Sequence, residues 1–383
     1  MGMRVLIVIL LMFVLTGTSR ADDVNTELAR QLAELNDQIL KDPQNIDLTL
    51  RYAHLAEQQG DLRKALSAYE RVTVNTPSNA EAQAGFRRVS RKLQPDKTTI
   101  VAEIGGGWES NPARDAVTRK PDWLALARVE LKDERSFGDV HWRTLGTAMG
   151  EFYKLQGGDL NYTYAGGLTG PMSDLTSQIA LHTGLGGGAA SFAQRLLYHE
   201  AVGGLTLETG FWGGAQSTKL RVGYRRYSDF YGAGEGFYGD LSSRLGFTDV
   251  FQKKDILVGT PSIRWSGISG GPALNIPLEE TQPGHYLESS FRAEYFVPLV
   301  EWLTFGTSMS VTHRRYIDVT ILDTGEPVLR RDWLFIPGVS LIFPNVFGKM
   351  DFHIDYKYED NRSNVDFDRY ITQQITTSVV FRF

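Results

Sequence analysis

Few residues of this sequence have the types and spacing that catalysis requires. Gly267-Ile268-Ser269-Gly270-Gly271 matches the G-x-S-x-G pattern around the nucleophilic serine of many hydrolases. That pattern functions between a strand and a helix, whereas Pro272 follows closely here in a glycine-rich stretch. The chain has 7 histidines, none with a second histidine four residues later, and no cysteine. We predict no enzymatic activity, no catalytic or metal-binding residue, and no cofactor.

Two glycine-rich stretches are interpreted as connections between strands. Gly232-Ala233-Gly234-Glu235-Gly236 lacks the lysine and the following helix that a phosphate-binding loop needs. Gly186-Gly187-Gly188-Ala189-Ala190 has a similar composition. Neither stretch therefore predicts a nucleotide site.

A run of basic residues suggests instead that anions bind along one wall of the protein. It consists of Lys219, Arg221, Arg225 and Arg226. Its inward members could form a ladder that guides an anionic solute or polymer. They could equally pair with acidic residues on neighbouring strands and brace the wall, the candidates being Glu200, Glu208 and Asp240.

These charges belong to a region whose apolar residues recur with the period of two that marks β-strands. Candidate strands lie at about 98–110, 122–133, 139–153, 159–170, 175–188, 197–210, 217–231, 236–248, 254–267, 285–299, 302–318, 331–343, 349–361 and 369–383. Connections after even strands are short, whereas those after odd strands are mostly longer, as at 268–284 and 319–330. Short periplasmic turns and long outer loops are typical of a transmembrane barrel. We predict an all-β transmembrane antiparallel barrel of about 14 strands over residues 98–383.

The two faces of these strands separate by polarity. Apolar side chains predicted to face outward include Leu160, Tyr162, Tyr164, Leu205, Leu207, Leu303, Phe305, Met309, Val311, Trp333, Phe335, Val339 and Leu341. The predicted lumen residues are Arg128, Arg143, Arg221, Arg225, Arg264, Arg292, Arg314, Glu130, Glu208 and Glu294. An Arg or Lys facing lipid near the midplane costs about 2–4 kcal/mol, so these charges belong inside. A soluble β-sandwich is the alternative, with its apolar face buried and its polar face exposed.

The last strand, which ends on Phe383, carries a further pattern. Phe381 and Phe383 share one apolar face, and the chain ends within the strand. This resembles the last strand of bacterial outer-membrane barrels, in which the terminal Phe is part of the signal read by the insertion machinery. The resemblance implies that Phe381 and Phe383 are the barrel-assembly signal.

The N-terminal 21 residues have the pattern of a secretory signal peptide. Arg4 precedes an apolar run from Val5 to Leu15, and Ser19-Arg20-Ala21 supplies small residues for cleavage before Asp22. The run of about eleven residues is short for a membrane-spanning helix, which needs ~20. An uncleaved anchor is the alternative interpretation of residues 1–21.

Residues 22–94 have helical periodicity and an internal repeat. Pro43 and Pro77 lie 34 residues apart, as do Asn45 and Asn79, which is the period of a tetratricopeptide repeat. The segment from Asn45 to Ser78 resembles one such repeat, with packing residues at Leu55, Gly60, Ala65, Tyr69 and Pro77. We predict a TPR-like periplasmic domain over residues 22–94, either a docking module or a helical spacer.

The layout as a whole resembles the surface lipoprotein assembly modifier family of Gram-negative outer membranes. The local similarities are Gly107-Trp108-Glu109-Ser110-Asn111-Pro112, Arg330-Arg331-Asp332 and Tyr358-Glu359-Asp360-Asn361-Arg362-Ser363-Asn364. It also resembles barrels that export exopolysaccharide. Both resemblances imply an outer-membrane channel that passes a protein or polysaccharide cargo received by periplasmic helices. A passive or structural barrel is the third possibility.

The partners expected from this interpretation are outer-membrane lipid, the barrel-insertion machinery and a periplasmic cargo. The net charge of −5 points neither toward nor away from nucleic acid, and we predict no nucleic-acid partner.

Overall fold

The structure, a computed structural model, describes residues 27–76, 79–93, 96–137, 140–155, 159–176, 179–211, 214–231, 234–270, 282–321, 325–346 and 348–383. The chain divides into two compact units, Met1–Gln94 and Pro95–Phe383. The predicted signal peptide at 1–21 lies outside the described residues.

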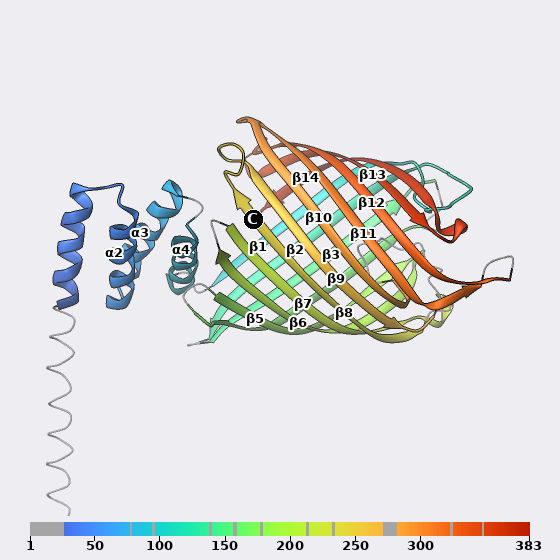
Figure 1. The fold of residues 1–383 in the computed structure, drawn as a ribbon, viewed down its shortest axis with the longest axis horizontal. Helices are drawn as coiled ribbons and strands as arrows, with labels where there is room; N and C mark the ends of the chain where they lie inside the picture. The colour runs from blue at the N-terminus through green and yellow to red at the C-terminus, as the bar shows by residue number, and fades with distance from the viewer. Residues whose placement is uncertain are drawn as a thin grey trace, which may run out of the picture. The chain divides into compact units, whose positions relative to one another are not determined.

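The first unit is helical. Residues 27–41 form one helix, and it is followed by α2 (Ile46–Gln59), α3 (Leu62–Asn75) and α4 (Ala80–Leu93) (Figure 1). The Asn45 side chain caps α2 by accepting a hydrogen bond from the Leu48 amide, and Asp61 caps α3 in the same way. Gly60 ends α2 with φ of 85°, a conformation that favours glycine. No helix within the described residues is long and apolar enough to span a membrane.

The helical core is built around Tyr69, whose side chain is fully buried. A Cβ atom at Gly85 on α4 would lie 2.4 Å from the Tyr69 ring, so the ring fits only against a glycine. Of the predicted packing residues, Ala65 and Tyr69 are buried, Leu55 packs against the core and Gly60 caps α2. Pro77 lies outside the described residues.

A largely buried carboxylate, 11% exposed, links three helices of this unit. Glu57 on α2 accepts hydrogen bonds from Arg88 at 2.6 Å and from Lys92 at 3.0 Å, both on α4. Burial alone would raise the pKa of Glu57, but these two cations hold it at about 2. The Tyr69 hydroxyl contacts the same carboxylate and also the His54 ring, at 3.4 and 3.0 Å respectively.

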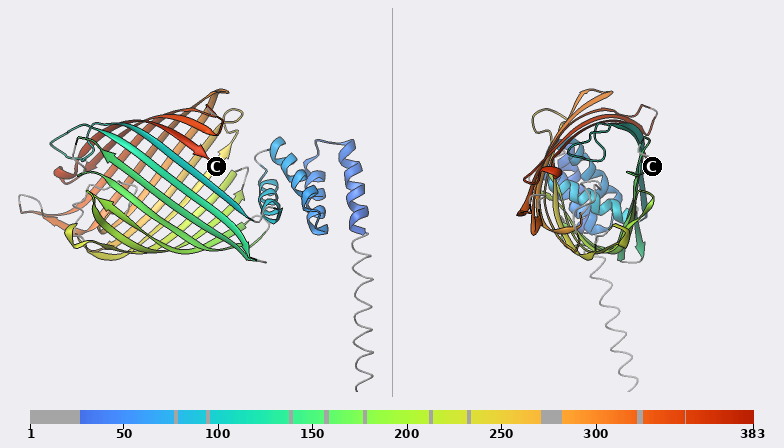
Figure 2. Two further views of the ribbon diagram at one scale, coloured as in Figure 1. Left: turned by 180° about the vertical axis from the view of Figure 1, so that it is seen from behind. Right: turned by 90° about the vertical axis from the view of Figure 1, so that its right-hand side faces the viewer.

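The second unit is a closed antiparallel barrel in which each strand pairs with its neighbours in sequence and β1 pairs with β14 (Figures 1 and 2). The strands are β1 (Lys97–Glu109), β2 (Asp122–Phe137), β3 (Val140–Tyr153), β4 (Tyr162–Asp174), β5 (Ile179–Phe192), β6 (Arg195–Phe211), β7 (Gly214–Tyr227), β8 (Glu235–Thr248), β9 (Ile256–Ile268), β10 (Gly284–Val300), β11 (Leu303–Ile321), β12 (Pro327–Phe343), β13 (Met350–Ser363) and β14 (Tyr370–Arg382). This confirms the predicted all-β transmembrane antiparallel barrel. Because the barrel is closed, the backbone N–H and C=O groups of each strand have a neighbouring strand to bond on both sides, as a lipid environment requires.

The barrel closes at the chain terminus. Ile100 and Phe383 exchange backbone hydrogen bonds at 3.1 and 2.9 Å, so the final residue extends the β1–β14 ladder. The rings of Phe381 and Phe383 stack with centroids 6.3 Å apart. The terminal Phe is therefore part of the closing seam.

Two predicted connections are strands instead. Residues 319–330 were expected to be a loop, but Val319, Thr320 and Ile321 pair with Leu329, Val328 and Pro327 after a register shift between Arg315 and Val319. That bulge extends the hairpin beyond the regular alternation on which the prediction relied. Gly186 to Ala190 lie inside β5, where a Cβ on Gly186 would meet the Gly167 oxygen at 1.9 Å.

The outward assignment of Tyr162 and Tyr164 is wrong. Tyr162 is fully buried, and the Tyr164 hydroxyl donates to Glu200 at 3.2 Å inside the barrel. Glycine at 188 leaves room for the Tyr164 ring, since a Cβ there would lie 2.8 Å from its hydroxyl oxygen. An apolar ring with a polar end thus faces the lumen because its hydroxyl finds a partner there. Met309, Trp333 and Val339, also predicted outward, are exposed.

Candidate functional site in the barrel lumen

A cavity of about 820 Å³ occupies the interior of the barrel. The charged residues that line it are eight cations, Arg128, Lys219, Arg221, Arg225, Arg244, Arg264, Arg292 and Arg314, and five anions, Glu130, Glu200, Asp240, Glu288 and Glu294. Among the described lining residues, positive charge therefore exceeds negative charge by three.

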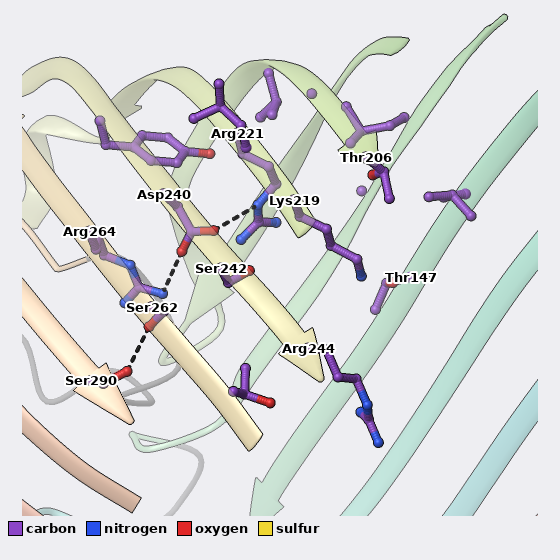
Figure 3. Close-up of a pocket in the computed structure, with 18 of the residues that line it drawn as sticks. Thr147, Thr206, Lys219, Arg221, Asp240, Ser242, Arg244, Ser262, Arg264 and Ser290 are labelled. Carbon is purple, nitrogen blue, oxygen red and sulfur yellow. Dashed lines mark hydrogen bonds and ion pairs between the residues drawn. The ribbon is translucent and has the colours of Figure 1, made fainter. Parts of the chain in front are cut away.

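One row of alternating charges crosses the wall from β7 to β12. Register pairing places Arg221, Asp240, Arg264, Glu288, Arg314 and Asp332 side by side. Arg221 lies 3.8 Å from Asp240, which lies 3.5 Å from Arg264 (Figure 3). Arg264 and Arg314 then approach Glu288 at 3.4 and 2.6 Å. Because each charge has an opposite neighbour, this row braces the wall.

The next row toward the short connections is lined by hydroxyls. Its register partners are Thr206, Lys219, Ser242, Ser262, Ser290 and Thr312. The Ser262 and Ser290 hydroxyls lie 2.6 Å apart. Arg244 follows Ser242 by two residues on β8, so both point inward.

Lys219 and Arg244 differ from the arginines of the ionic row. Figure 3 shows both side chains extending into the cavity from neighbouring strands. Both are exposed within it, and no carboxylate pairs with either cation in the part of the chain that the structure describes. They are therefore available to bind an anion, which a water-filled cavity lined with hydroxyls can admit.

Toward the longer connections, Arg225 is buried among aromatic rings. Its guanidinium donates to Glu200 at 2.8 Å and lies 3.8 Å from the centre of the Tyr198 ring. The Tyr238 hydroxyl also donates to Glu200, at 2.8 Å. Within this cluster the charges of Arg225 and Glu200 neutralise each other, and the aromatic rings pack around them in the barrel wall.

Some of the remaining predicted lumen residues line the cavity, and others lie outside its lining. Arg143 is buried and bridges Glu134 and Glu208 at 2.6 and 2.7 Å, outside the residues that line the cavity. Arg128 pairs with Glu130 on its own strand at 3.1 Å, and both line the cavity with Arg292 and Glu294.

The four residues of the basic run have different positions. Arg221 and Arg225 form ion pairs that brace the wall, and Lys219 faces the cavity. Arg226 pairs with Glu235 on the outer face.

A second polar cluster joins the motifs at the seam of the barrel. Arg114, from the connection after β1, contacts Glu359 at 3.0 Å and Glu109 at 3.8 Å. Tyr370 donates to Glu359 and Tyr153 donates to Glu109, at 2.8 and 2.7 Å. The two carboxylates are about 1% exposed, so Arg114 fixes the first long connection against β13 and β1.

The Arg330-Arg331-Asp332 motif continues this cluster. Arg330 bonds Asp332 at 2.8 Å and Asp368 at 2.7 Å, and the Asn361 side chain donates to the Asp368 backbone. Burial raises the pKa of Asp368 to about 6, although Arg330 opposes that shift. All three motifs of the family resemblance therefore lie at the loop ends of β1, β12, β13 and the connection before β14.

The serine of the G-x-S-x-G pattern has a structural role. The Ser269 hydroxyl donates to the Glu235 carbonyl at 3.0 Å and accepts from the Glu235 amide at 3.2 Å. Gly271 lies outside the described residues. Within the described ranges, no group of three or more His, Asp and Glu side chains could hold a metal ion.

Sequence reasoning missed Arg244, Glu288 and the hydroxyl row. The signal was present in the alternation, because Glu288 follows the outward Leu287 and Arg244 lies four residues after Asp240. What was lacking was the register that brings these residues together.

Comparison with known proteins gives only a distant likeness. No family model matches the sequence, and no curated protein does. Among solved structures, Pseudomonas aeruginosa OccK5 (OpdH) aligns with a TM-score of 0.38 and 12% identity, covering 76% of this chain and 99% of that one. Acinetobacter baumannii OccAB3 aligns with a TM-score of 0.37 and 11% identity, covering 75% and 99%. Similarity at this level does not assign the chain to a family.

The membrane assignment follows from the barrel itself. Its wall is closed, its strand number is even, its outer face is apolar and its lumen is charged. This is the architecture of bacterial outer-membrane barrels. The protein is an outer-membrane barrel.

Proposed function

We propose that the protein is an outer-membrane translocation channel whose lumen takes an extended, anionic and hydroxyl-bearing cargo such as an acidic polysaccharide. The observation that carries this proposal is the row of serine and threonine hydroxyls that includes Lys219, with Arg244 two residues beyond its Ser242 on β8. Cations attract the carboxylates or phosphates of such a polymer. Hydroxyls can donate to and accept from its sugar hydroxyls.

The size of the lumen favours a thin chain over a folded cargo. A cavity of about 820 Å³ is in the range of sites that hold a few sugar units or one small solute. The ionic row is part of the cavity wall and its charges are paired with one another, so opening a wider passage would separate several ion pairs.

The helical unit is proposed to dock the cargo in the periplasm. It joins the barrel through β1, at the end where the connections are short, and short connections are periplasmic in outer-membrane barrels. Its helices bury their apolar faces around Tyr69, so the unit does not need the barrel to complete its core.

Translocation of a surface lipoprotein or another protein is the second candidate. The observation that favours it is the convergence of the three motifs of the family resemblance at the seam between the first and last strands. A seam built around buried Arg114 is a place where a protein cargo could leave the barrel. If neither a polysaccharide nor a protein cargo passes through the barrel, the protein is a passive or structural barrel.

The experiment is reconstitution of the full mature chain into a planar lipid bilayer. We expect ion conductance with preference for anions, and reversible block by an oligosaccharide of uronic acids added from the periplasmic side. A neutral glucose oligosaccharide of equal length is the matched control and should block at least tenfold more weakly. A barrel without conductance would contradict the channel, and equal block by both sugars would contradict the anionic cargo.

A further inference from the structure

Two arginines face each other on the outer surface of the barrel. Arg315 on β11 and Arg331 on β12 are register partners, so their Cβ atoms are expected about 5 Å apart. Arg314 lines the cavity, which places the adjacent Arg315 on the opposite, outer face. Both arginine side chains are exposed.

No described residue neutralises this pair. No carboxylate pairs with either guanidinium among the residues that the structure describes. Like charges directly opposite each other destabilise a sheet. Arg362 on β13 adds a third cation nearby as the register partner of Trp333, although it bonds Asp360 at 2.9 Å. Counting only the described residues, the patch formed by Arg315, Arg331 and Arg362 therefore has two positive charges without a carboxylate partner.

Aromatic side chains place this patch relative to the membrane. The rings of His313 and Trp333 stack with centroids 4.4 Å apart, and Trp333 also stacks on Phe335 at 6.4 Å. Trp333 is 46% exposed on the outer surface. Such aromatic groups lie where the hydrocarbon meets the polar headgroups.

The arginines lie beyond that aromatic group, toward the long connections. Arg315 follows His313 by two residues and Arg331 precedes Trp333 by two, a rise of about 6–7 Å along each strand. This is the level of lipid headgroups. The long connections are extracellular in this class of barrel, so the headgroups belong to the outer leaflet.

We propose that Arg315 and Arg331, supported by Arg362, bind a phosphate of an outer-leaflet phosphorylated glycolipid. Guanidinium groups bind phosphate through paired hydrogen bonds, and one phosphate between the two arginines would relieve their repulsion. The stacked His313, Trp333 and Phe335 rings supply an apolar surface for the acyl chains beneath it. This site is independent of the lumen, because a barrel that conducts nothing could still bind lipid there.

The test is native mass spectrometry of the full mature chain in detergent, titrated with lipid A that carries two phosphates. The matched ligand control is the same glycolipid after enzymatic removal of its phosphates. We expect the wild type to bind the phosphorylated form at least tenfold more tightly. The variant Arg315→Gln/Arg331→Gln should lose that difference.

Arg226→Gln is the matched protein control, since Arg226 is also exposed on the outer face but is paired with Glu235 at 3.6 Å. It should bind lipid A as the wild type does. In lipid-free detergent the double variant should unfold at the same temperature as the wild type or a higher one, because a like-charge pair has been removed.

Three results would overturn the proposal. They are equal wild-type binding of the two glycolipids, unchanged binding by the double variant, and equal affinity for phosphatidylglycerol, which would indicate a general anionic-lipid patch. If the double variant does not assemble, the comparison of the two glycolipids on the wild type still decides the question.

Discussion

Reversing the two lumen cations that have no carboxylate partner among the described residues should reverse the ion selectivity of the channel. The substitutions are Lys219→Glu and Arg244→Glu. The described cavity lining has eight cations and five anions in the wild type, and the double variant would have six and seven. The excess of three positive charges thus becomes an excess of one negative charge.

The expected magnitude follows from Coulomb's law. A monovalent anion about 5 Å from a unit charge in water gains about 0.8 kcal/mol. Screening at 0.1 M salt reduces this to about 0.5 kcal/mol. Reversing Lys219 and Arg244 changes four unit interactions, which sum to about 2 kcal/mol. This corresponds to roughly a thirtyfold fall in local anion concentration.

The assay is the reversal potential in a planar bilayer under a tenfold KCl gradient, where ideal selectivity gives about 59 mV. We expect a potential of one sign for the wild type and a smaller potential of the same sign for Arg244→Glu alone, which leaves seven cations and six anions. The double variant should have the opposite sign. Arg226→Glu is the control, because its side chain is on the outer face and its reversal leaves the lumen unchanged. An unchanged sign in the double variant, or an equal shift in the control, would refute the reasoning.

Four further predictions concern assembly and stability. Deletion of Phe383 removes the last pair of the closing ladder and should severely reduce the assembled, heat-modifiable barrel on gels; normal levels would show that the seam closes without it. Deletion of residues 23–92 behind the predicted signal sequence should leave an assembled barrel but abolish cargo export, and normal export would make the helices a spacer. Gly85→Ala should cost about 1–3 kcal/mol by overpacking the Tyr69 ring and should raise hydrogen exchange in the helical unit alone; unchanged exchange would contradict the contact. Asp368 has a folded pKa of about 6 against 3.8, so its proton is bound more tightly in the folded state and stability should rise as the pH falls from 7 to 5; Asp368→Asn should remove that rise in the gel-shift temperature, and an unchanged pH profile would contradict it.

The sequence alone predicted the class of fold because local patterns encode it. Alternation from residue 98 onward fixed the strands, their even number and the division between apolar and charged faces, since successive side chains point to opposite faces. The helices were predicted for the same reason, from the helical periodicity of residues 22–94 and the 34-residue repeat. The expectation that charged residues face the lumen rested on the cost of placing them in lipid.

The tertiary structure decided which charges meet. Lys219 and Arg221 are indistinguishable in sequence, yet register places Arg221 opposite Asp240 and Lys219 opposite Ser242. One is therefore paired and the other is exposed in the cavity, and a shift of two residues would exchange their roles.

Long-range packing decided the rest. Tyr164 faces inward because Glu200, two strands away, accepts its hydroxyl and Gly188 leaves space for its ring. After the register shift that follows Arg315, residues 319–321 pair with residues 327–329, so part of the predicted loop is strand. Strand alternation is a property of the local chain, whereas register and bulges are set by hydrogen bonds between distant segments, and those contacts make the lumen site.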